Sequence, residues 1–497
     1  MQNRLNRFRS REAREKGFAI VLTTIALTVM IPVVGLGVDA SLMYGIKARI
    51  TSAADAAAIS SARNLSVGLT IAQQETNALS TATRFFDANF PPGSFLTNSS
   101  RTITPTVAET AYRTRTVTVD VTVSAPTLFM RYLNPNAVTV RTLGKASRRD
   151  VNVIMVLDRS GSMNDNGGCP AMKAAATSFA QRFANFRDRV GMVSYSVDYR
   201  IDFALQDPPG DFQNATTGIP AKATALSCGG TTATGTAFWQ GYQELKRINE
   251  AGALNVILLM TDGQPNTVPF DFSASIDAYG YNAIRRNIAA PAPQKYTRSA
   301  SSTWNSWTSK SPCSSVTGKI GMVNPFGSPL SGIFNPVGGA RISGTNCRFV
   351  ANGDGWVHQD LAFLPSQDMY GTSVNSSTYM STLKWPAGHP DAGRIESDDA
   401  GALTNAAMNQ VANAAIRVRA NETAAGELNT ITYSIGFGNG IGEPEFDMLR
   451  RAANVPHVTN NMYDPSKPEG FFVYAPTTSA LNEAFVKIAS EILRLAK

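Results

Sequence analysis

Oxygen-bearing side chains follow two apolar runs of the chain at short, regular spacing. After the first run come Asp158, Ser160 and Ser162, so that an acid and two hydroxyls recur at every second residue. The second run leads to Asp262, and a threonine-rich loop between the two carries Thr232. Hard divalent cations such as Mg²⁺ take carboxylate and hydroxyl oxygens as ligands. These five side chains therefore predict a divalent metal site.

The two apolar runs are the elements that must position these side chains. Val151 to Leu157 and Val256 to Met260 each have the length and composition of a buried strand. In an open α/β sheet the carboxyl ends of parallel strands open into one crevice. Residues far apart in sequence would therefore meet at that edge of the sheet.

The remainder of the region from Asp150 onward alternates helical and strand-like patterns. Strands are expected at 189–196, 199–205 and 430–436. Apolar residues recur at helical spacing in four groups: Met172, Ala176, Phe179, Phe183 and Phe186; Phe238, Tyr242 and Leu245; Met408, Val411, Ala415 and Val418; and Leu481, Phe485, Ile488, Ile492 and Leu495. The alternation predicts an α/β fold with a doubly wound, mostly parallel sheet.

The pattern of the five ligands resembles that of a von Willebrand factor type A (VWA) domain with a metal-ion-dependent adhesion site. That pattern is Asp-x-Ser-x-Ser, a Thr, and an Asp after a buried strand. Thr232 is preferred over its neighbour because Thr234 and a small residue follow it, and Thr231 stays open as a substitute.

The resemblance also implies how such a site works. The hydroxyls would bind Mg²⁺ (or Mn²⁺ or Ca²⁺) directly, and the carboxylates would act partly through water. The sixth position would be left for an acidic side chain of a protein partner.

A long stretch interrupts the alternation at about 268–399. It is rich in Ser, Asn, Gly and Pro, and a loop of this length is unusual inside a compact domain. Four of the five tryptophans fall in it, Trp304, Trp307, Trp356 and Trp385, whereas disordered segments are poor in aromatics. We interpret it as a folded insertion, whose rings form either a recognition surface or a local core.

The amino terminus predicts a membrane anchor. A basic arm at 1–17 precedes an apolar run at 18–38, which is long enough to cross a bilayer as a helix. The basic side would remain in the cytoplasm, placing residues after Asp39 outside. The protein would then be a single-pass protein of the inner or cytoplasmic membrane, with its bulk periplasmic or extracellular. A cleaved signal peptide is the competing interpretation, although no small-x-small cleavage site follows promptly.

The segment 17–65 resembles the Tad-type amino-terminal segment of TadG-like proteins, which accompany the tight-adherence (Flp) pilus machinery of bacteria. The resemblance lies in Val38-Asp39, in Tyr44 and in the alanine-rich run at 53–58. An alanine-rich helical stalk is the plainer alternative. Gly17 resembles the cleavage point of type IV pilin-like precursors, but Leu22 stands where such pilins commonly carry Glu.

Residues 39–149 are expected to contain this helix and a small α+β module. Ile71, Ala78, Ala82 and Phe85 have helical spacing. Valines alternate with polar residues from 116 to 123, as in a strand with one wet face, and a strand around 138–140 is expected to pair with it. The VWA domain would then occupy 150–497.

The composition is consistent with an exported protein that is held by a single membrane anchor. The chain has 497 residues, 43% of them hydrophobic and 16% charged, which allows two or three domains. The basic arm contributes to the net charge of +8, so no nucleic-acid binding is inferred. All four cysteines follow the membrane segment, as suits an oxidising compartment. A Cys169–Cys228 disulfide would hold the two metal loops together, and a Cys313–Cys347 disulfide would cross-link the insertion. Free buried thiols are the alternative.

The chain is not predicted to be an enzyme. Its three histidines belong to no zinc or nucleophile motif. We expect a membrane-anchored envelope protein that binds protein partners through its metal site, among them other components that assemble or anchor tight-adherence pili. The alternative function is a surface adhesin that binds a host or environmental ligand through the same site. A metal-assisted hydrolase is a more distant alternative.

Overall fold

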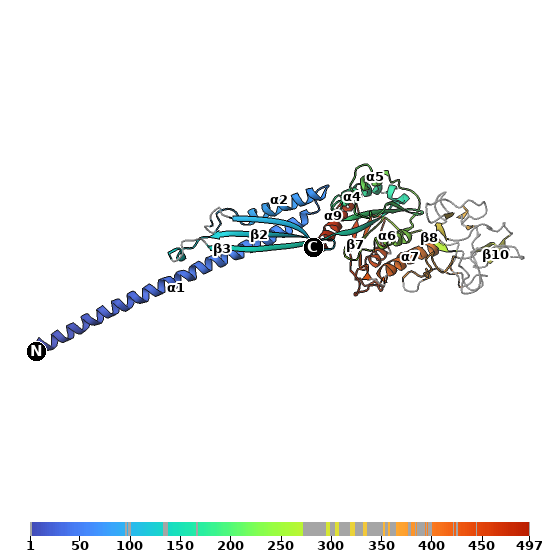
Figure 1. Cartoon of the computed structure of the whole chain (residues 1–497). Coiled ribbons are helices and arrows are strands. Elements are labelled where there is room, and N and C mark those ends of the chain that lie inside the picture. Colours follow the sequence, from blue (N-terminus) through green and yellow to red (C-terminus); the bar gives the residue numbers. More distant parts are fainter. Residues whose placement is uncertain are drawn as a thin grey trace. The chain divides into compact units, whose positions relative to one another are not determined.

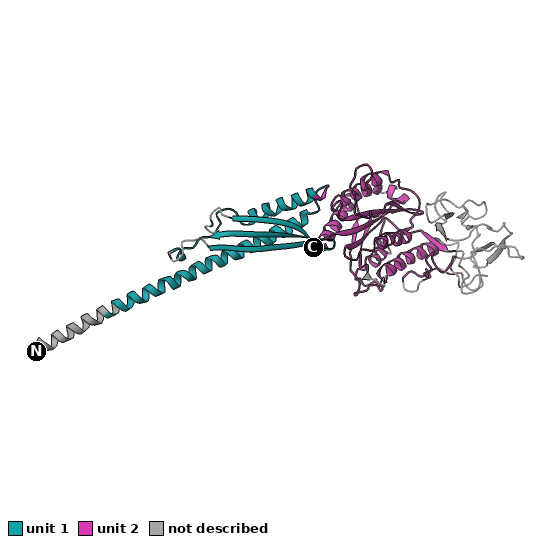
Figure 2. Ribbon diagram, viewed as in Figure 1, with its two compact units in different colours: residues 1–68, 72–148, 497 teal, residues 69–71, 149–496 magenta. Residues whose placement is uncertain are grey.

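The computed structural model divides into two compact units (Figure 2). Unit 1 comprises Met1–Gly68 and Ala72–Arg148 together with Lys497, and unit 2 comprises Leu69–Ile71 and Arg149–Ala496. The structure describes residues 2–94, 97, 101–132, 138–165, 167–271, 295–298, 304–307, 319–323, 332–334, 351–352, 356–357, 364–375, 379–382, 384, 393, 395, 400–420, 422–423, 426–443 and 445–496.

Unit 1 is built on one continuous helix, α1 (Gln2–Asn64), which contains Pro32 (Figure 1). It includes the apolar run predicted to cross a membrane, and its large side chains from Phe18 to Val38 are exposed. Thr24 and Thr28 donate their hydroxyl protons to carbonyls one turn earlier, at 2.8 and 2.7 Å. Within the described residues, α1 is the one helix long and apolar enough to span a bilayer.

The other half of unit 1 is an antiparallel sheet with a second helix. The sheet has the order β1 (Arg101–Ala111), β2 (Thr114–Ala125), β3 (Val138–Arg149), and α2 is Ile71–Asn89. A short 3₁₀ turn, η2 (Met130–Tyr132), lies between β2 and β3. The alternating valines of β2 are fully buried against α1 and α2, as the alternation predicted. Gly144 permits close contact between β3 and α1, because a Cβ there would lie 2.3 Å from the Ala54 carbonyl oxygen.

The predicted face of α2 is partly wrong. Phe86 is buried and Phe85 is 45% exposed. The core-facing side of the helix also carries Gln74, which accepts a 3.3 Å hydrogen bond from Arg115 and donates one of the same length to the Gly68 carbonyl. A polar residue thus occupies a core position, which apolar periodicity does not reveal.

Unit 2 is built on a six-stranded sheet with the order β18-β17-β7-β4-β5-β6. The strands are β4 (Val151–Asp158), β5 (Arg189–Tyr195), β6 (Tyr199–Phe203), β7 (Leu254–Thr261), β17 (Thr430–Phe437) and β18 (Phe472–Ala475). All neighbours run parallel except the edge strand β6, which is antiparallel to β5. The carboxyl ends of β4 and β7 therefore lie side by side.

Helices cover both faces of this sheet, which confirms the predicted doubly wound α/β fold. On one face, α4 (Gly168–Ala180), α5 (Ile219–Ala225) and α9 (Thr478–Leu495) pack with side chains such as Val153. On the other, α6 (Thr234–Ile248), α7 (Ala400–Ala420) and α8 (Glu445–Ala452) pack with side chains such as Ile154. Every β4 residue is buried, as expected for a central strand covered on both sides.

The helix after the first loop is shorter than its apolar spacing predicts. It ends at Ala180, and Phe186 is 39% exposed with a φ of 61°. The turns that follow are stabilised by Asp188, which accepts hydrogen bonds from the backbone N–H groups of Ala184 at 2.6 Å and Val151 at 2.9 Å. Phe183 is buried within these turns. The helical spacing of apolar residues therefore continues beyond the end of the helix.

The described part of the stretch predicted as an insertion contains several short strands. They are β8 (Thr267–Asp271), β9 (Lys295–Arg298), β10 (Trp304–Trp307), β11 (Lys319–Val323), β12 (Gly332–Phe334), β13 (Ala351–Asn352) and β14 (Trp356–Val357). β11 pairs with both β8 and β12, β9 with β10, and β13 with β14, all antiparallel. The role predicted for the four tryptophan rings lies outside the described residues. Two further short elements are the hairpin β15 (Glu422–Thr423) and β16 (Gly426–Glu427), and the helix α3 (Gly161–Asp165).

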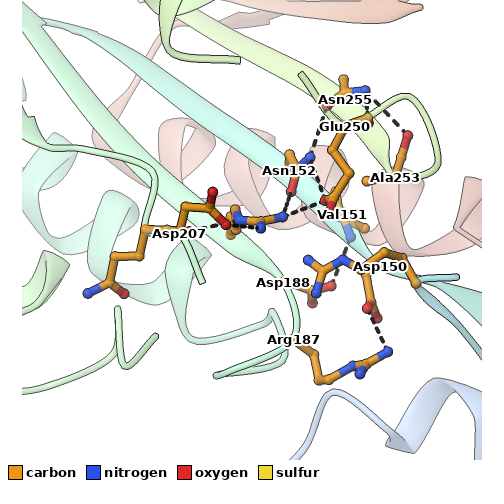
Figure 3. A network of polar contacts seen from close by, with 12 residues as sticks. Asp150, Val151, Asn152, Arg187, Asp188, Asp207, Glu250, Ala253 and Asn255 are labelled. Atoms are coloured by element: carbon orange, nitrogen blue, oxygen red, sulfur yellow. Dashed lines mark hydrogen bonds and ion pairs between the residues drawn. The ribbon is translucent and has the colours of Figure 1, made fainter. Parts of the chain in front are cut away.

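A polar network lies at the amino-terminal ends of β4, β5 and β7 (Figure 3). The other ends of β4 and β7 lead to Asp158 and Asp262. Arg189 is 4% exposed, forms an ion pair with Glu250 and donates to Asp207 at 2.7 Å. Asn152 donates to Asn255 at 3.1 Å, which joins the second residues of β4 and β7. Apart from Asp207, whose side chain is 59% exposed, these groups are buried and mutually paired, so this edge is structural.

Candidate functional site

The first loop of the candidate site starts where β4 ends. Asp158 is fully buried, and its two carboxylate oxygens accept separate hydrogen bonds. One comes from the backbone N–H of Ser160 at 2.8 Å and the other from the Thr261 hydroxyl at 2.7 Å. The carboxylate therefore joins the ends of two neighbouring strands.

Three of the predicted ligands converge on one point. The Ser160 and Ser162 hydroxyl oxygens are 3.0 Å apart. Ser162 donates to the Asp262 carboxylate at 2.7 Å, and Ser160 lies 3.4 Å from the same oxygen. Asp262 directly follows β7 and is only 5% exposed. Side-chain oxygen atoms of both loops thus lie within 3.4 Å of one another.

The threonine loop lies against the first loop. The Gly229 N–H donates to the Arg159 carbonyl at 2.8 Å, and the Gly161 N–H donates to the Gly230 carbonyl at 2.9 Å. Gly230 has a φ of 92°, in the left-handed region that favours glycine. These bonds hold the residues just before Thr232 beside Ser160 and Ser162.

The two candidate threonines have different hydrogen-bond partners. The Thr231 hydroxyl lies 2.7 Å from the hydroxyl of Thr267 and is committed to that pair. Thr232 is 5% exposed, and its backbone N–H donates to Asn266 at 2.8 Å. Among the described residues its side chain makes no hydrogen bond to the other four predicted ligands. The two threonines therefore differ in that the Thr231 hydroxyl is paired with Thr267 and the Thr232 hydroxyl is not paired with those four residues.

Burial and a neighbouring carboxylate disfavour the ionised form of Asp158. Burial, followed by the nearby charge of Asp262, raises the pKa of Asp158 to about 7. Arg159 does not offset this charge, because its guanidinium donates to Ser194 at 3.2 Å and to Asp198 at 2.7 Å. Two buried carboxylates close together are unfavourable unless a proton or a cation accompanies them.

The set of donor atoms fits a hard divalent cation. Two carboxylates and three hydroxyls supply oxygen only, as Mg²⁺, Mn²⁺ and Ca²⁺ prefer. Within the described parts of the chain, no three His, Cys, Asp or Glu side chains cluster as metal ligands, so a zinc-like centre is not seen there.

A disulfide ties the two loops together, as predicted. Cys169, near the start of α4, is bonded to Cys228, with their Cα atoms 6.2 Å apart. Asn164 adds a 3.1 Å hydrogen bond to the Cys228 carbonyl. The alternative of free thiols is therefore wrong for this pair. The predicted Cys313–Cys347 pairing lies outside the described residues.

Two supporting residues were missed by sequence reasoning. Thr261 orients Asp158 through its hydroxyl, which also lies 3.1 Å from the Gly263 carbonyl oxygen. Asn266 holds the backbone of Thr232. Thr261 stands directly before Asp262, and a hydroxyl at that position was the available signal.

Two family models match the chain. Residues 17–64 match the putative Flp pilus-assembly TadE/G-like family, and residues 152–302 match the von Willebrand factor type A domain. The chain therefore carries a Tad-type amino-terminal segment and a VWA domain. No curated protein matches it.

Several solved structures are similar to the chain at low identity. The pilus adhesin SpaC from Lactobacillus rhamnosus GG is 13% identical with a TM-score of 0.35, and the match covers 80% of this chain and 35% of SpaC. The PilB minor pilin from Streptococcus sanguinis is 15% identical with a TM-score of 0.36, covering 80% and 79%. The vWF domain of the type V pili tip protein Mfa5 from Porphyromonas gingivalis is 16% identical, with a TM-score of 0.36, covering 71% and 98%. The chain thus spans about a third of the length of SpaC.

Proposed function

We propose that this protein, which carries a Tad-type segment and a VWA domain, binds a protein partner through a divalent cation in the assembly or anchoring of a tight-adherence pilus. The proposed ligands are Asp158, Ser160, Ser162, Thr232 and Asp262. The observation that carries this proposal is the convergence of Ser160, Ser162 and Asp262, with oxygen–oxygen distances of 2.7 to 3.4 Å.

Each side chain has a distinct role in the proposal. The hydroxyls of Ser160, Ser162 and Thr232 would contact the cation directly. Asp158 already accepts hydrogen bonds at both oxygens, from Ser160 and Thr261, which favours contact through water. Neutral hydroxyl ligands leave a cation electrophilic, so it would attract an acidic side chain of the partner.

The anchoring part of the proposal rests on α1. Its exposed apolar run and the match of residues 17–64 to the TadE/G-like family support a membrane-anchored protein associated with pili. We propose that the basic residues before Phe18 stay in the cytoplasm and that unit 2 lies outside, in the periplasm or at the cell surface.

Calorimetric titration of the full chain in detergent with Mg²⁺ or Mn²⁺ tests the site. Asp158→Ala should abolish cation binding, because the loop would lose the carboxylate that orients Ser160. Asp165→Ala is the matched control, since Asp165 is an exposed acid on the neighbouring α3. Unchanged affinity in Asp158→Ala would overturn the assignment, provided that circular dichroism shows both variants folded.

Affinity capture tests the partner. The full chain, solubilised from bacterial envelopes, should retain other pilus-assembly components in Mg²⁺ and release them in a chelator. Retention that survives the chelator and the Asp158→Ala change would sink cation-mediated binding. Chelator-sensitive binding to a host or environmental ligand alone would favour the adhesin.

A further inference from the structure

One residue of the membrane-spanning run is not exposed. Among the described residues from Phe18 to Val38, Gly35 alone is buried. Phe129 covers it: a Cβ on Gly35 would lie 2.5 Å from Cγ of that ring. The loop after β2 therefore contacts α1 inside the segment that crosses the membrane.

A buried carboxylate fixes this loop one helical turn further along. Asp39 is 1% exposed and lies on the same face of α1 as Gly35, four residues away. Its oxygens accept hydrogen bonds from the backbone N–H groups of Leu128 at 2.8 Å, Phe129 at 3.0 Å and Met130 at 2.6 Å. These three backbone N–H groups, at and just before the start of η2, thus have a hydrogen-bond acceptor within the protein.

The tip of this loop, residues 128–131, presents apolar side chains outward. Leu128 is 39% exposed and Phe129 is 41% exposed, although the ring also covers Gly35. Arg131, at the end of the tip, is exposed as well. An apolar surface followed by a basic side chain matches the sequence of environments at a bilayer surface, from acyl chains to anionic headgroups.

We propose that the tip is a second membrane contact, which inserts into the leaflet on the side of the bilayer that faces unit 1. The inference rests on the membrane anchoring in the proposed function. Gly35 lies three residues inside the end of the apolar run, which corresponds to a depth of about 4.5 Å at 1.5 Å per residue. That depth is the boundary between headgroups and acyl chains, where amphipathic segments insert by about 5–10 Å.

The tip continues the exposed apolar surface of α1. This favours lipid over a protein partner as the molecule that the tip contacts. The Phe129 ring covers Gly35, and the neighbouring Leu36 and Val38 belong to the exposed apolar surface of α1. Backbone N–H groups that enter a bilayer must be satisfied internally, and Asp39 satisfies three of them.

Photocrosslinking of the full chain in vesicles of phosphatidylethanolamine and phosphatidylglycerol tests the proposal. A benzophenone amino acid is placed in turn at positions 128, 129, 27 and 112, and lipid adducts are measured by mass spectrometry. Position 27 lies in the spanning run and reports the anchor itself. Position 112 is the control: Tyr112 is 73% exposed in the β1–β2 turn, at the opposite end of β2.

Lipid adducts are expected at 27, 128 and 129 and not at 112. Adducts at 27 without adducts at 128 and 129 would overturn the tip contact while leaving the anchor intact. Absence of adducts at 27 as well would instead contradict the anchoring. Adducts of 128 and 129 to protein alone would assign the tip to a protein partner.

A second measurement uses the carboxylate that holds the tip. Asp39→Ala should lower the lipid adduct at position 129 severalfold and leave the adduct at position 27 unchanged. Asp55→Ala is the matched control, because Asp55 is an exposed acid further along the same helix. Equal adduct yields at 129 in both variants would contradict the role given to Asp39.

Discussion

The Ser162 hydroxyl donates a 2.7 Å hydrogen bond to Asp262, although the two residues are 100 positions apart in the chain. The pairing of β4 with β7 brings them together, because parallel neighbours end at the same edge of the sheet. The candidate site is therefore a product of strand order, and changes that disturb either loop should affect cation binding.

Thr232→Val is expected to weaken cation binding at least tenfold, because it removes a proposed ligand hydroxyl while keeping the size of the side chain. Thr231→Val is the control, since the Thr231 hydroxyl is paired with Thr267. Calorimetric titration with Mg²⁺ measures both affinities. If Thr231→Val proves the more damaging change, Thr231 is the ligand and our assignment is reversed.

The double change Cys169→Ser with Cys228→Ser should destabilise unit 2 by about 2–4 kcal/mol, the usual contribution of a disulfide that closes a long loop. It should also weaken cation binding, because the two loops would have to be ordered on binding. Thermal unfolding and titration measure the two effects. Cys313→Ser with Cys347→Ser serves as the comparison, and an equal loss of affinity there would argue against a local clamp.

Arg189→Ala should destabilise unit 2 by about 3–5 kcal/mol, because it removes the positive charge that is ion-paired with the buried Glu250. Arg494→Ala should destabilise unit 2 far less, since the Arg494 side chain is 62% exposed in its pair with Glu491. Urea unfolding followed by fluorescence compares them. Similar midpoints for both variants would mean that the network at the amino-terminal edge contributes little to stability.

A phosphatase that is active only outside the cytoplasm should be active when it is fused after Lys497. The expectation comes from the basic residues before Phe18, which favour a cytoplasmic amino terminus. A β-lactamase fusion at the same site provides an independent measure of export. Activity of a reporter that functions only in the cytoplasm would reverse the proposed orientation.

Secondary-structure elements were predicted well where a single sequence pattern, such as a continuous apolar run, is strong. The central strands are continuous apolar runs, and β4 and β17 lie within one residue of their predicted bounds. The same runs placed Asp158 and Asp262 at strand ends, which predicted their proximity. The Cys169–Cys228 bridge followed from the position of both cysteines beside those loops.

Other features depend on partners that periodicity does not reveal. The core face of α2 is set partly by Gln74 and its hydrogen bonds, so Phe86 is buried and Phe85 is not. The end of α4 depends on Asp188, whose carboxylate binds two backbone N–H groups. The contact of Phe129 with Gly35 joins residues far apart in the chain, and no local pattern signals it.

The continuity of α1 has a mechanical consequence. The helix that contains the membrane-spanning run also supplies Ala53, Ala54, Ala57 and Ala58 to the core of unit 1. The anchor is therefore not attached through a flexible linker. A pulling force on unit 1 directed away from the bilayer would load α1 lengthwise and shear it along β2, so that many side-chain contacts would have to break together before the helix slid free.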